Sequence, residues 1–309
     1  MKNKNTIRYI GALIGALALM SGCSIHEDLD ECYTLRLKVE NVSGDDITAL
    51  GTVSDATLYI FDGNLNFLET RELEKDFVTS REVITLNYPE NTKLHIVAWG
   101  NLGGGKETVS KATKADELKV MLKTQESIAS SPDSLFFGSK EVTTRGTGVA
   151  GGNQEIVIVP KIGTVTMETK GLSYALGARG LKASGDCDFY MNRTLSGFDY
   201  TGKQIGDSVY YNPEGMWNPL TASEWVTTHA QTLCEGQNMS GSLYVGGQFI
   251  QEVTEGQYMD DTVGPIEISA EHNTHVVFQW GENGAFLGAR IIVTPWGYVE
   301  DNSELKPVN

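Results

Sequence analysis

Short runs of alternating apolar and polar residues recur along this chain, separated by clusters of Gly, Asn and Asp. The clearest run starts at Tyr33, where Tyr33, Leu35, Leu37 and Val39 alternate with polar residues up to Glu40. Successive side chains of a β-strand point to opposite faces of the sheet, so an apolar residue at every second position marks one buried face. The pattern predicts a half-buried first strand over residues 33–40.

Further runs rich in β-branched and aromatic residues predict more strands between turn residues. The run at 93–99 is mostly apolar, which predicts a central strand that is covered on both faces. Gly246 and Gly247 predict a tight hairpin turn between two of the strands. We expect residues 194–218 to be mostly irregular. The remaining predicted strands lie at 56–61, 66–73, 81–88, 135–137, 141–143, 154–170, 186–191, 242–245, 248–253, 275–280 and 289–294.

One stretch has a helical rather than a strand-like period. Within residues 113–124, Ala115, Leu118, Met121 and Leu122 would share one face of a helix, with Lys and Glu on the other face. This spacing predicts one short helix, packed across an edge or end of a sheet. The strand predicted at 154–170 is interrupted by Pro160 and Gly163, which is typical of a bulge or of a crossing between domains. We therefore place a domain boundary close to Pro160.

Composition and charge narrow the functional classes. The chain has 309 residues, 34 of them Gly, and a formal net charge of −16. That length accommodates two domains of ordinary size. So acidic a surface repels phosphate backbones, which argues against a nucleic-acid partner. Beyond residue 22, no apolar run approaches the ~20 residues that a membrane-spanning helix requires.

The N-terminus has the layout of an export signal. Lys2, Lys4 and Arg8 precede an apolar run at 10–20, which is too short to span a bilayer stably. The sequence Met20-Ser21-Gly22-Cys23 then resembles a bacterial lipobox, with Met where Leu is most common. The resemblance implies cleavage between Gly22 and Cys23 and lipid attachment at Cys23, which would become the mature N-terminus. The alternative is an ordinary secretory signal with a chance Cys.

Cleavage at that point would remove three basic residues and leave 21 basic and 40 acidic residues, a formal charge of −19. Acyl chains contribute about 0.8 kcal/mol per buried methylene, so several chains together hold a protein durably on a membrane. An acidic stretch follows at 26–31. It resembles the signal that sends Bacteroidetes lipoproteins to the outer face of the outer membrane; the alternative is a solvated spacer.

Three further cysteines, Cys32, Cys187 and Cys234, are present besides Cys23. An oxidising compartment favours disulfides, and an odd number leaves one thiol unpaired. Cys187 and Cys234 fall in the same half of the chain, so we expect a disulfide between them and Cys32 as a small buried residue. Sequence alone does not determine the connectivity.

No motif predicts a metal site, a cofactor site or an active site. Asp62, Asn64 and Asn66 imitate the start of an EF-hand loop, but its glycine and final glutamate are missing, so we expect a hairpin turn. The glycine-rich segment 145–153 precedes a predicted strand, whereas a phosphate loop requires a helix. His272 and His275 lack a set of further ligands. Nucleophile elbows and metalloprotease motifs are missing, so we expect no enzyme activity and no cofactor.

Aromatic residues gather between positions 198 and 225. Trp217 and Trp225, with nearby tyrosines, are candidates for a glycan-binding platform because aromatic faces stack on sugars. The alternative, which we favour, is that these rings pack loops onto a sheet.

Several segments together resemble the fimbrial anchor lipoproteins of Bacteroidetes, within the fimbrillin-like superfamily. The resemblance rests on Cys23 with the acidic residues up to Cys32, and on three segments at 58–62, 96–101 and 291–296. It implies an all-β fold of two tandem transthyretin-like Greek-key β-sandwich domains. The implied organisation is a signal peptide at 1–22, an acidic tether at 23–32, an N-terminal sandwich at 33–159 and a C-terminal sandwich at 160–309.

The same resemblance implies a role at the base of a cell-surface fimbrium. In such fimbriae, subunits join by donor-strand exchange, in which an extended segment of one subunit fills a groove in its neighbour. Stalk subunits lose their first strand and their lipid to an Arg-specific protease, whereas anchors keep both. The first strand has one Arg, Arg36, in its middle, and residues 41–54 contain no Arg or Lys. The expected partners are therefore stalk subunits and the outer membrane.

Two other functional hypotheses stay open. The chain could be a tip or accessory adhesin of the same fold, with a host ligand. It could also be a surface glycan-binding lipoprotein, on the strength of Trp217 and Trp225. The gene next to this one would discriminate among the three, since a stalk-subunit gene there favours the anchor role.

Overall fold

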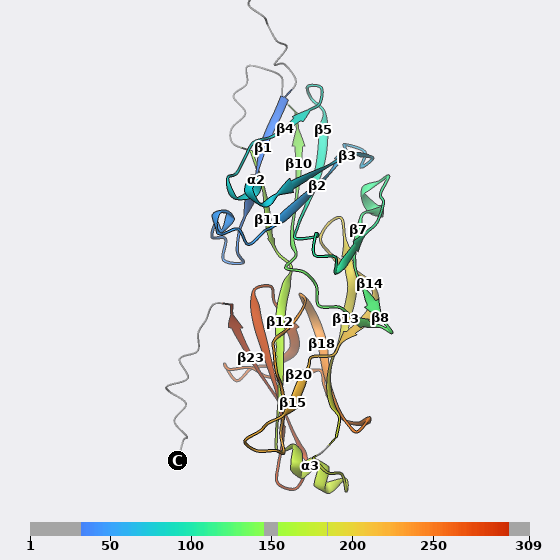
Figure 1. Cartoon of the computed structure of the whole chain (residues 1–309), viewed down its shortest axis with the longest axis vertical. Helices are drawn as coiled ribbons and strands as arrows, with labels where there is room; N and C mark the ends of the chain where they lie inside the picture. Colours follow the sequence, from blue (N-terminus) through green and yellow to red (C-terminus); the bar gives the residue numbers. More distant parts are fainter. Residues whose placement is uncertain (1–31, 145–153, 184, 297–309) are drawn as a thin grey trace, which may run out of the picture.

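The computed structural model describes residues 32–144, 154–183 and 185–296. Within these ranges the protein is almost entirely β-structure (Figure 1), and its two α-helices are short: α2 (Lys75–Thr79) and α3 (Leu172–Ala178). Neither helix approaches the length and apolarity with which a helix crosses a bilayer. The predicted all-β fold class is confirmed.

Among the described residues, seven strands that precede Lys161 form one sheet, in the order β3-β2-β5-β10-β11-β1-β4. Residues of all seven strands meet in one hydrophobic core, which we name the small core. The strands are β1 (Cys32–Val39), β2 (Asp55–Asp62), β3 (Phe67–Glu74), β4 (Ile84–Asn87), β5 (Lys93–Gly100), β10 (Phe136–Thr143) and β11 (Glu155–Pro160).

A second, larger sheet contains the other strands and encloses what we name the large core. These strands are β6 (Glu107–Val109), β7 (Lys119–Leu122), β8 (Thr124–Gln125), β9 (Ile128–Ala129), β12 (Ile162–Lys170), β13 (Cys187–Asp199), β14 (Gln204–Tyr211), β15 (Gly215–Trp217), β16 (Trp225–Thr227), β17 (Gln231–Cys234), β18 (Gly236–Val245), β19 (Gln248–Val253), β20 (Glu255–Gln257), β21 (Val263–Ile268), β22 (His272–Trp280) and β23 (Phe286–Pro295).

The chain passes from one sheet to the other at Lys161. β11 ends at Pro160 beside β10, and β12 begins at Ile162 beside β17 and pairs with β22 from Thr164 onward. Figure 1 shows the seven-stranded sheet at one end of the molecule and β12 to β23 towards the other. The segment from β6 to β9 lies in the first half of the chain, yet it joins the second sheet through β13 and β14. The two-domain division at Pro160 stays a prediction.

Strand β5 is central and is covered on both faces, as its apolar sequence predicted. It lies between β2 and β10. Leu94, Ile96 and Ala98 face the small core, while Val97 and Trp99 face the large core. The Trp99 ring packs 4.8 Å from the Phe137 ring and 5.5 Å from the Phe198 ring on β13 (centroid distances), so these aromatics join the two sheets.

The helix predicted at 113–124 is wrong. The segment contains one 3-10 turn, Ala115–Glu117, followed by strand β7. Val120 and Leu122 are buried alternately in β7, and the strand pairs with β13. Pairing with a long neighbouring strand overrides the local helical spacing, which is a weak determinant. The short helix of the first half is α2, at a position where the sequence predicted none.

Two other expectations about the second half have opposite outcomes. Residues 194–218 are not mostly irregular, because β13 continues to Asp199 and β14 follows. The hairpin across Gly246 and Gly247 is confirmed: both glycines have positive φ, 56° and 74°, between β18 and β19. A two-residue turn with two positive φ values is the type that fits the twist of paired strands.

Candidate functional site: the first strand and its clasp

The first strand lies inside the seven-stranded sheet, not at its edge. Residues Arg36 to Val39 of β1 pair in parallel with β11, and Cys32 to Leu35 pair antiparallel with β4. The parallel ladder continues at both ends, where Arg36 N–H donates to the Gln154 carbonyl at 2.8 Å and Glu40 N–H to the Ile158 carbonyl at 3.0 Å. Removing β1 would therefore expose the backbones of two neighbouring strands.

The side chains of β1 follow the predicted alternation. Leu35 and Leu37 are each 2% exposed and Val39 is 1% exposed, and all three lie in the small core. Tyr33 packs against the same core as a partly buried ring. Fully burying one such aliphatic side chain contributes roughly 1.5–3 kcal/mol. The first strand is therefore a structural part of the small core, and its predicted position and buried face are confirmed.

A clasp holds the C-terminal end of β1, and sequence reasoning missed it. Thr48 lies in the 3-10 turn Thr48–Leu50, and its hydroxyl oxygen accepts a 2.9 Å hydrogen bond from Val39 N–H. The same hydroxyl donates to Asp46 Oδ1 at 2.8 Å, and Ile47 N–H donates to the Val39 carbonyl. The Asp-x-Thr spacing in a polar turn was the available signal, since such side chains cap turns.

The clasp continues through charged groups to the turn before β4. Asp46 forms an ion pair with Arg81. Burial acts to raise the pKa of Asp46, but the hydrogen bonds from Thr48 and Arg81 together hold that pKa below its ordinary value. The Arg81 carbonyl in turn accepts a 3.1 Å hydrogen bond from Arg36 Nε. The middle and the end of β1 are thus tied to the same turn.

Arg36 is the residue at which an Arg-specific protease would cut the first strand. Its backbone is paired with Glu155 of β11, and the next residue, Leu37, is buried. A protease binds its substrate as an extended, unpaired segment. The peptide bond after Arg36 is therefore out of reach while β1 stays in the sheet.

Gly22 and Cys23, the predicted cleavage and lipid-attachment residues, lie outside the described residues. The chain enters the described structure at Cys32, the first residue of β1. The signal peptide, the lipid and the acidic tether accordingly stay predictions.

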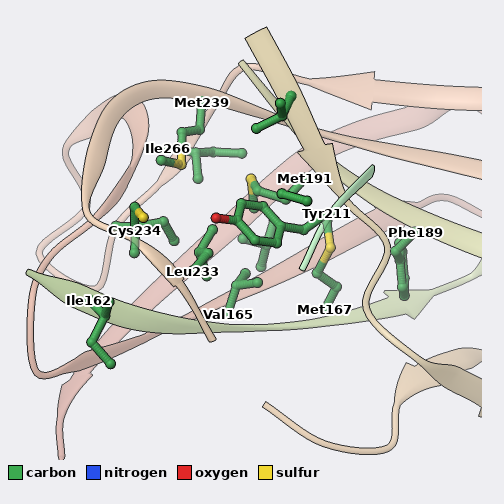
Figure 2. Close-up of a cluster of buried hydrophobic side chains, with 14 of the residues drawn as sticks. Ile162, Val165, Met167, Phe189, Met191, Tyr211, Leu233, Cys234, Met239 and Ile266 are labelled. Atoms are coloured by element: carbon green, nitrogen blue, oxygen red, sulfur yellow. The ribbon is translucent and has the colours of Figure 1, made fainter. Parts of the chain in front are cut away.

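The expected disulfide between Cys187 and Cys234 is wrong, because both are free, buried thiols. Cys187 opens β13, where it pairs with Val245, whereas Cys234 ends β17, where it pairs with Ile162. Figure 2 shows Cys234 beside Leu233, with the Tyr211 hydroxyl pointing towards it. Burial raises the pKa of Cys234 to about 12 and also raises that of Cys187. Neither thiol is activated for chemistry.

The tryptophans proposed as a glycan platform do lie together, but not as a flat surface. The rings of Trp217 and Trp225 are 5.3 Å apart and nearly perpendicular, at 79°. Trp225 is only 8% exposed, and Trp217 Nε1 donates to the Gly185 carbonyl. Edge-to-face packing of this kind is typical of loops held onto a sheet. The arrangement favours the packing interpretation.

The candidate metal ligands have local partners instead. Asp62 accepts hydrogen bonds from the backbone of Asn64 and Asn66, which makes it a turn cap. His272 Nδ1 lies 2.7 Å from the Ala270 carbonyl, and His275 Nδ1 lies 2.9 Å from Thr166 Oγ1. Among the described residues, no group of three or more His, Cys, Asp or Glu side chains could hold a metal ion.

Comparisons with known proteins point in one direction. The family model of the fimbrillin-A associated anchor proteins Mfa1 and Mfa2 matches residues 29–302. The fimbrial anchor protein Mfa2 from Porphyromonas gingivalis has a similar structure, with a TM-score of 0.59 at 14% identity over 85% of this chain and 98% of that chain. No curated protein matches the sequence.

Two further solved structures resemble this one. A candidate adhesin from Bacteroides ovatus has a TM-score of 0.64 at 14% identity, covering 88% of this chain and 96% of that chain. A candidate polysaccharide-binding protein from Bacteroides thetaiotaomicron has a TM-score of 0.62 at 16% identity, covering 85% of this chain and 96% of that chain. At these identities the likeness establishes a shared fold.

Proposed function

The chain belongs to the family of fimbrillin-A associated anchor proteins, and from that membership we propose that it is the lipid-anchored base subunit of a cell-surface fimbrium. In this proposal Cys23 carries the lipid, the first strand is retained, and stalk subunits join the protein by donor-strand exchange. The outer membrane holds the lipid, and the acidic residues after Cys23 favour its outward-facing leaflet.

The position of β1 is the observation that supports this role best. The strand is paired on both sides, three of its side chains are buried in the small core, and the Thr48 clasp holds its end. A subunit that must give up its first strand needs a strand that leaves readily. A base subunit needs a first strand that stays in the sheet, because losing β1 would also sever the segment that leads to Cys23.

The two-sandwich organisation belongs to the same proposal. An N-terminal sandwich over 33–159 would connect to the membrane, and a C-terminal sandwich over 160–309 would face the fibre. The small core, whose buried residues all lie before residue 160, and the crossing at Lys161 support this division.

Mass spectrometry of the mature protein, purified from the cell surface, tests the proposal. We expect a chain that begins at Cys23 and has the added mass of acyl groups. A Cys23→Ser variant should lose that mass and leave the membrane fraction. A mature chain that begins at Leu37 and carries no lipid would instead make the protein a stalk subunit.

A tip or accessory adhesin of the same fold predicts a different phenotype. Its deletion would abolish attachment to host cells or glycans while fimbriae stay on the cell. Deletion of a base subunit should release fimbriae into the medium, and electron microscopy together with immunoblots of the culture supernatant distinguishes the two.

A further inference from the structure

A groove of about 410 Å³ lies beside the last strand, at the outer side of the second sheet. Its floor includes Ile291 and Val293 of β23, with Pro265 of β21 opposite and Tyr258 at the turn between β20 and β21. Tyr258 is fixed there because its hydroxyl donates a 2.7 Å hydrogen bond to the Pro265 carbonyl. Figure 1 shows β23 at the outer side of this half of the molecule.

The backbone of β23 has an unfilled side along this groove. On one side β23 pairs with β22 along its whole length. On the other side, among the residues that the structure describes, only Arg290 pairs, with Gln257 of the short strand β20. Trp296 N–H bonds to the Glu271 carbonyl, which sets the alternation of the antiparallel ladder. By that alternation the N–H and carbonyl groups of Val293 point away from β22, towards the groove.

Edge strands usually carry features that prevent pairing with other chains. The edge strand β3 of the first sheet has four charged residues among its eight, in the sequence FLETRELE. β23, with the sequence FLGARIIVTP, has one charged residue, Arg290, and its Ile291 is fully buried. The exposed apolar side chains of Met259 and Val263 lie close by, at 65% and 67% exposure. The β23 edge is therefore much less protected than the β3 edge.

The charge of the groove narrows the choice of the peptide segment that could bind in it. Asp260 and Glu267 line the groove, and Asp261 follows directly in the chain. The protein's own residues 297–309 carry three acidic groups against one Lys, and a second copy of this chain is strongly acidic overall. Like charges would oppose both of these occupants. An extended segment with basic residues is the complement of this rim.

We propose that the groove between β23 and β21 receives an extended segment of the neighbouring fimbrial subunit, which adds to β23 as a further strand. Apolar side chains at alternate positions of that segment fill the groove over Val293, and a Lys or Arg beside them meets Asp260 and Glu267. This inference rests on the proposed function, because it names the surface that a base subunit offers to the fibre.

Binding of a short synthetic peptide, with Val at alternate positions and Lys between them, tests the proposal on the full soluble chain. We expect the peptide to bind and to slow hydrogen exchange of the Val293 amide, since strand addition occupies that N–H. A peptide with Glu in place of Lys should bind roughly tenfold or more weakly. Equal binding of the two peptides, or protection that maps to another strand, overturns the proposal.

Two variants test separately how much binding depends on the backbone N–H of Val293 and how much on the acidic side chains of the groove. Val293→Pro removes the outward N–H but leaves the ladder to β22 intact, so binding should fall roughly tenfold while the melting temperature changes little. The double variant Asp260→Lys with Glu267→Lys should reverse the preference between the two peptides. Phe249→Lys, at an exposed apolar residue of β19, is the matched control and should bind like the unaltered protein.

Removing residues 297–309 tests whether the protein's own C-terminal residues occupy the groove. A large gain in peptide affinity after their removal would overturn the proposal, because it would show that these residues compete with the peptide. In cells, Val293→Pro should leave the lipidated, uncut protein on the surface while fimbriae detach. Fimbriae that stay attached at normal levels would refute the groove but not the anchor role. An unaltered protein without lipid would refute the anchor role itself.

Discussion

The small and the large core differ in chemistry as much as in size. The small core is built almost entirely from Leu, Ile, Val and Ala, with Phe136 as its one buried aromatic ring among the described residues. The large core contains aromatic rings from many strands together with buried sulfur atoms, among them those of Met167, Met191 and Cys234. Aliphatic side chains have few rotamers, whereas Met adapts to irregular gaps.

The two cores also differ in how completely their buried polar groups are hydrogen-bonded. The polar side chains buried beside the small core, Thr48 and Thr144, are both hydrogen-bonded. Around the large core, several buried polar atoms have no partner among the described residues, among them Glu107 Oε2, Trp99 Nε1 and Trp225 Nε1. A buried polar atom without a partner destabilises the fold by about 1–3 kcal/mol. The buried polar groups of the small core, which includes the first strand, are thus more completely hydrogen-bonded than those of the large core.

This difference fits a division of tasks. The small core keeps β1 in place through well-packed aliphatic contacts and a satisfied clasp. The large core tolerates unpaired polar atoms, and its sheet leaves the β23 edge open. The predictions that follow test this contrast, from the largest expected effect to the smallest.

Among these variants, Leu37→Ala should cause the largest loss of stability, and it acts on the small core. The side chain is 2% exposed, and shortening it leaves a cavity that costs about 3 kcal/mol or more of unfolding free energy. Leu287→Ala is the matched control, because Leu287 is 69% exposed and its loss should change stability by less than about 0.5 kcal/mol. Urea unfolding measures both. Similar values for the two variants would mean that β1 does not contribute to the core.

Glu107→Gln should stabilise the large core, and more so at high pH. Burial, opposed by a hydrogen bond from Asp133 N–H and reinforced by the Asp133 charge, raises the pKa of Glu107 to about 7. Between pH 4.5 and 7 the folded protein keeps a proton that the unfolded chain releases, so stability falls as pH rises through this window.

The variant has no proton to lose at this position, so its advantage should grow across the window and reach up to about 3 kcal/mol near pH 8. Melting curves from pH 4 to pH 8 measure the effect, with Glu282→Gln, at an exposed position, as the control. A constant difference at all pH values would show that the pKa of Glu107 is the same in the folded and the unfolded chain.

Thr48→Val should loosen the clasp at the end of β1. The change keeps the shape of the side chain but leaves the buried Val39 N–H without its acceptor, which costs about 2 kcal/mol. Thr70→Val, at an exposed position of β3, should stay within about 0.5 kcal/mol. Limited digestion with an Arg-specific protease adds a second readout: cleavage after Arg36 should become faster in Thr48→Val and stay unchanged in the control.

The sequence predicted the strands whose burial follows from their own pattern. β1 and β5 were predictable because alternation at Leu35, Leu37 and Val39, and the unbroken apolar run of β5, depend only on which faces are covered. The helix prediction failed because Ala115 to Leu122 satisfies both periods, and pairing with β13 decides between them. The disulfide prediction failed because proximity in one half of the chain says nothing about which sheet receives each Cys.

The functional surfaces were harder to predict. The Thr48 clasp depends on a turn that folds back onto Val39, and the β23 groove depends on β20 being too short to cover β23. Both depend on where a strand or turn begins and ends, and such boundaries are the part of a structure that sequence patterns predict least well. Cys23 is the reverse case, since its motif is local and readable although the residue lies outside the described structure.

The parallel pairing of β1 with β11 has a mechanical consequence. β1 runs from the N-terminal end of the molecule towards its middle, and β11 runs beside it in the same direction and continues into β12. In a protein held at its N-terminus and pulled from the far end, the tension draws the two strands in opposite directions along their common axis. All the hydrogen bonds between them are then strained at once in shear, whereas an antiparallel pair pulled from its open end would separate one bond at a time.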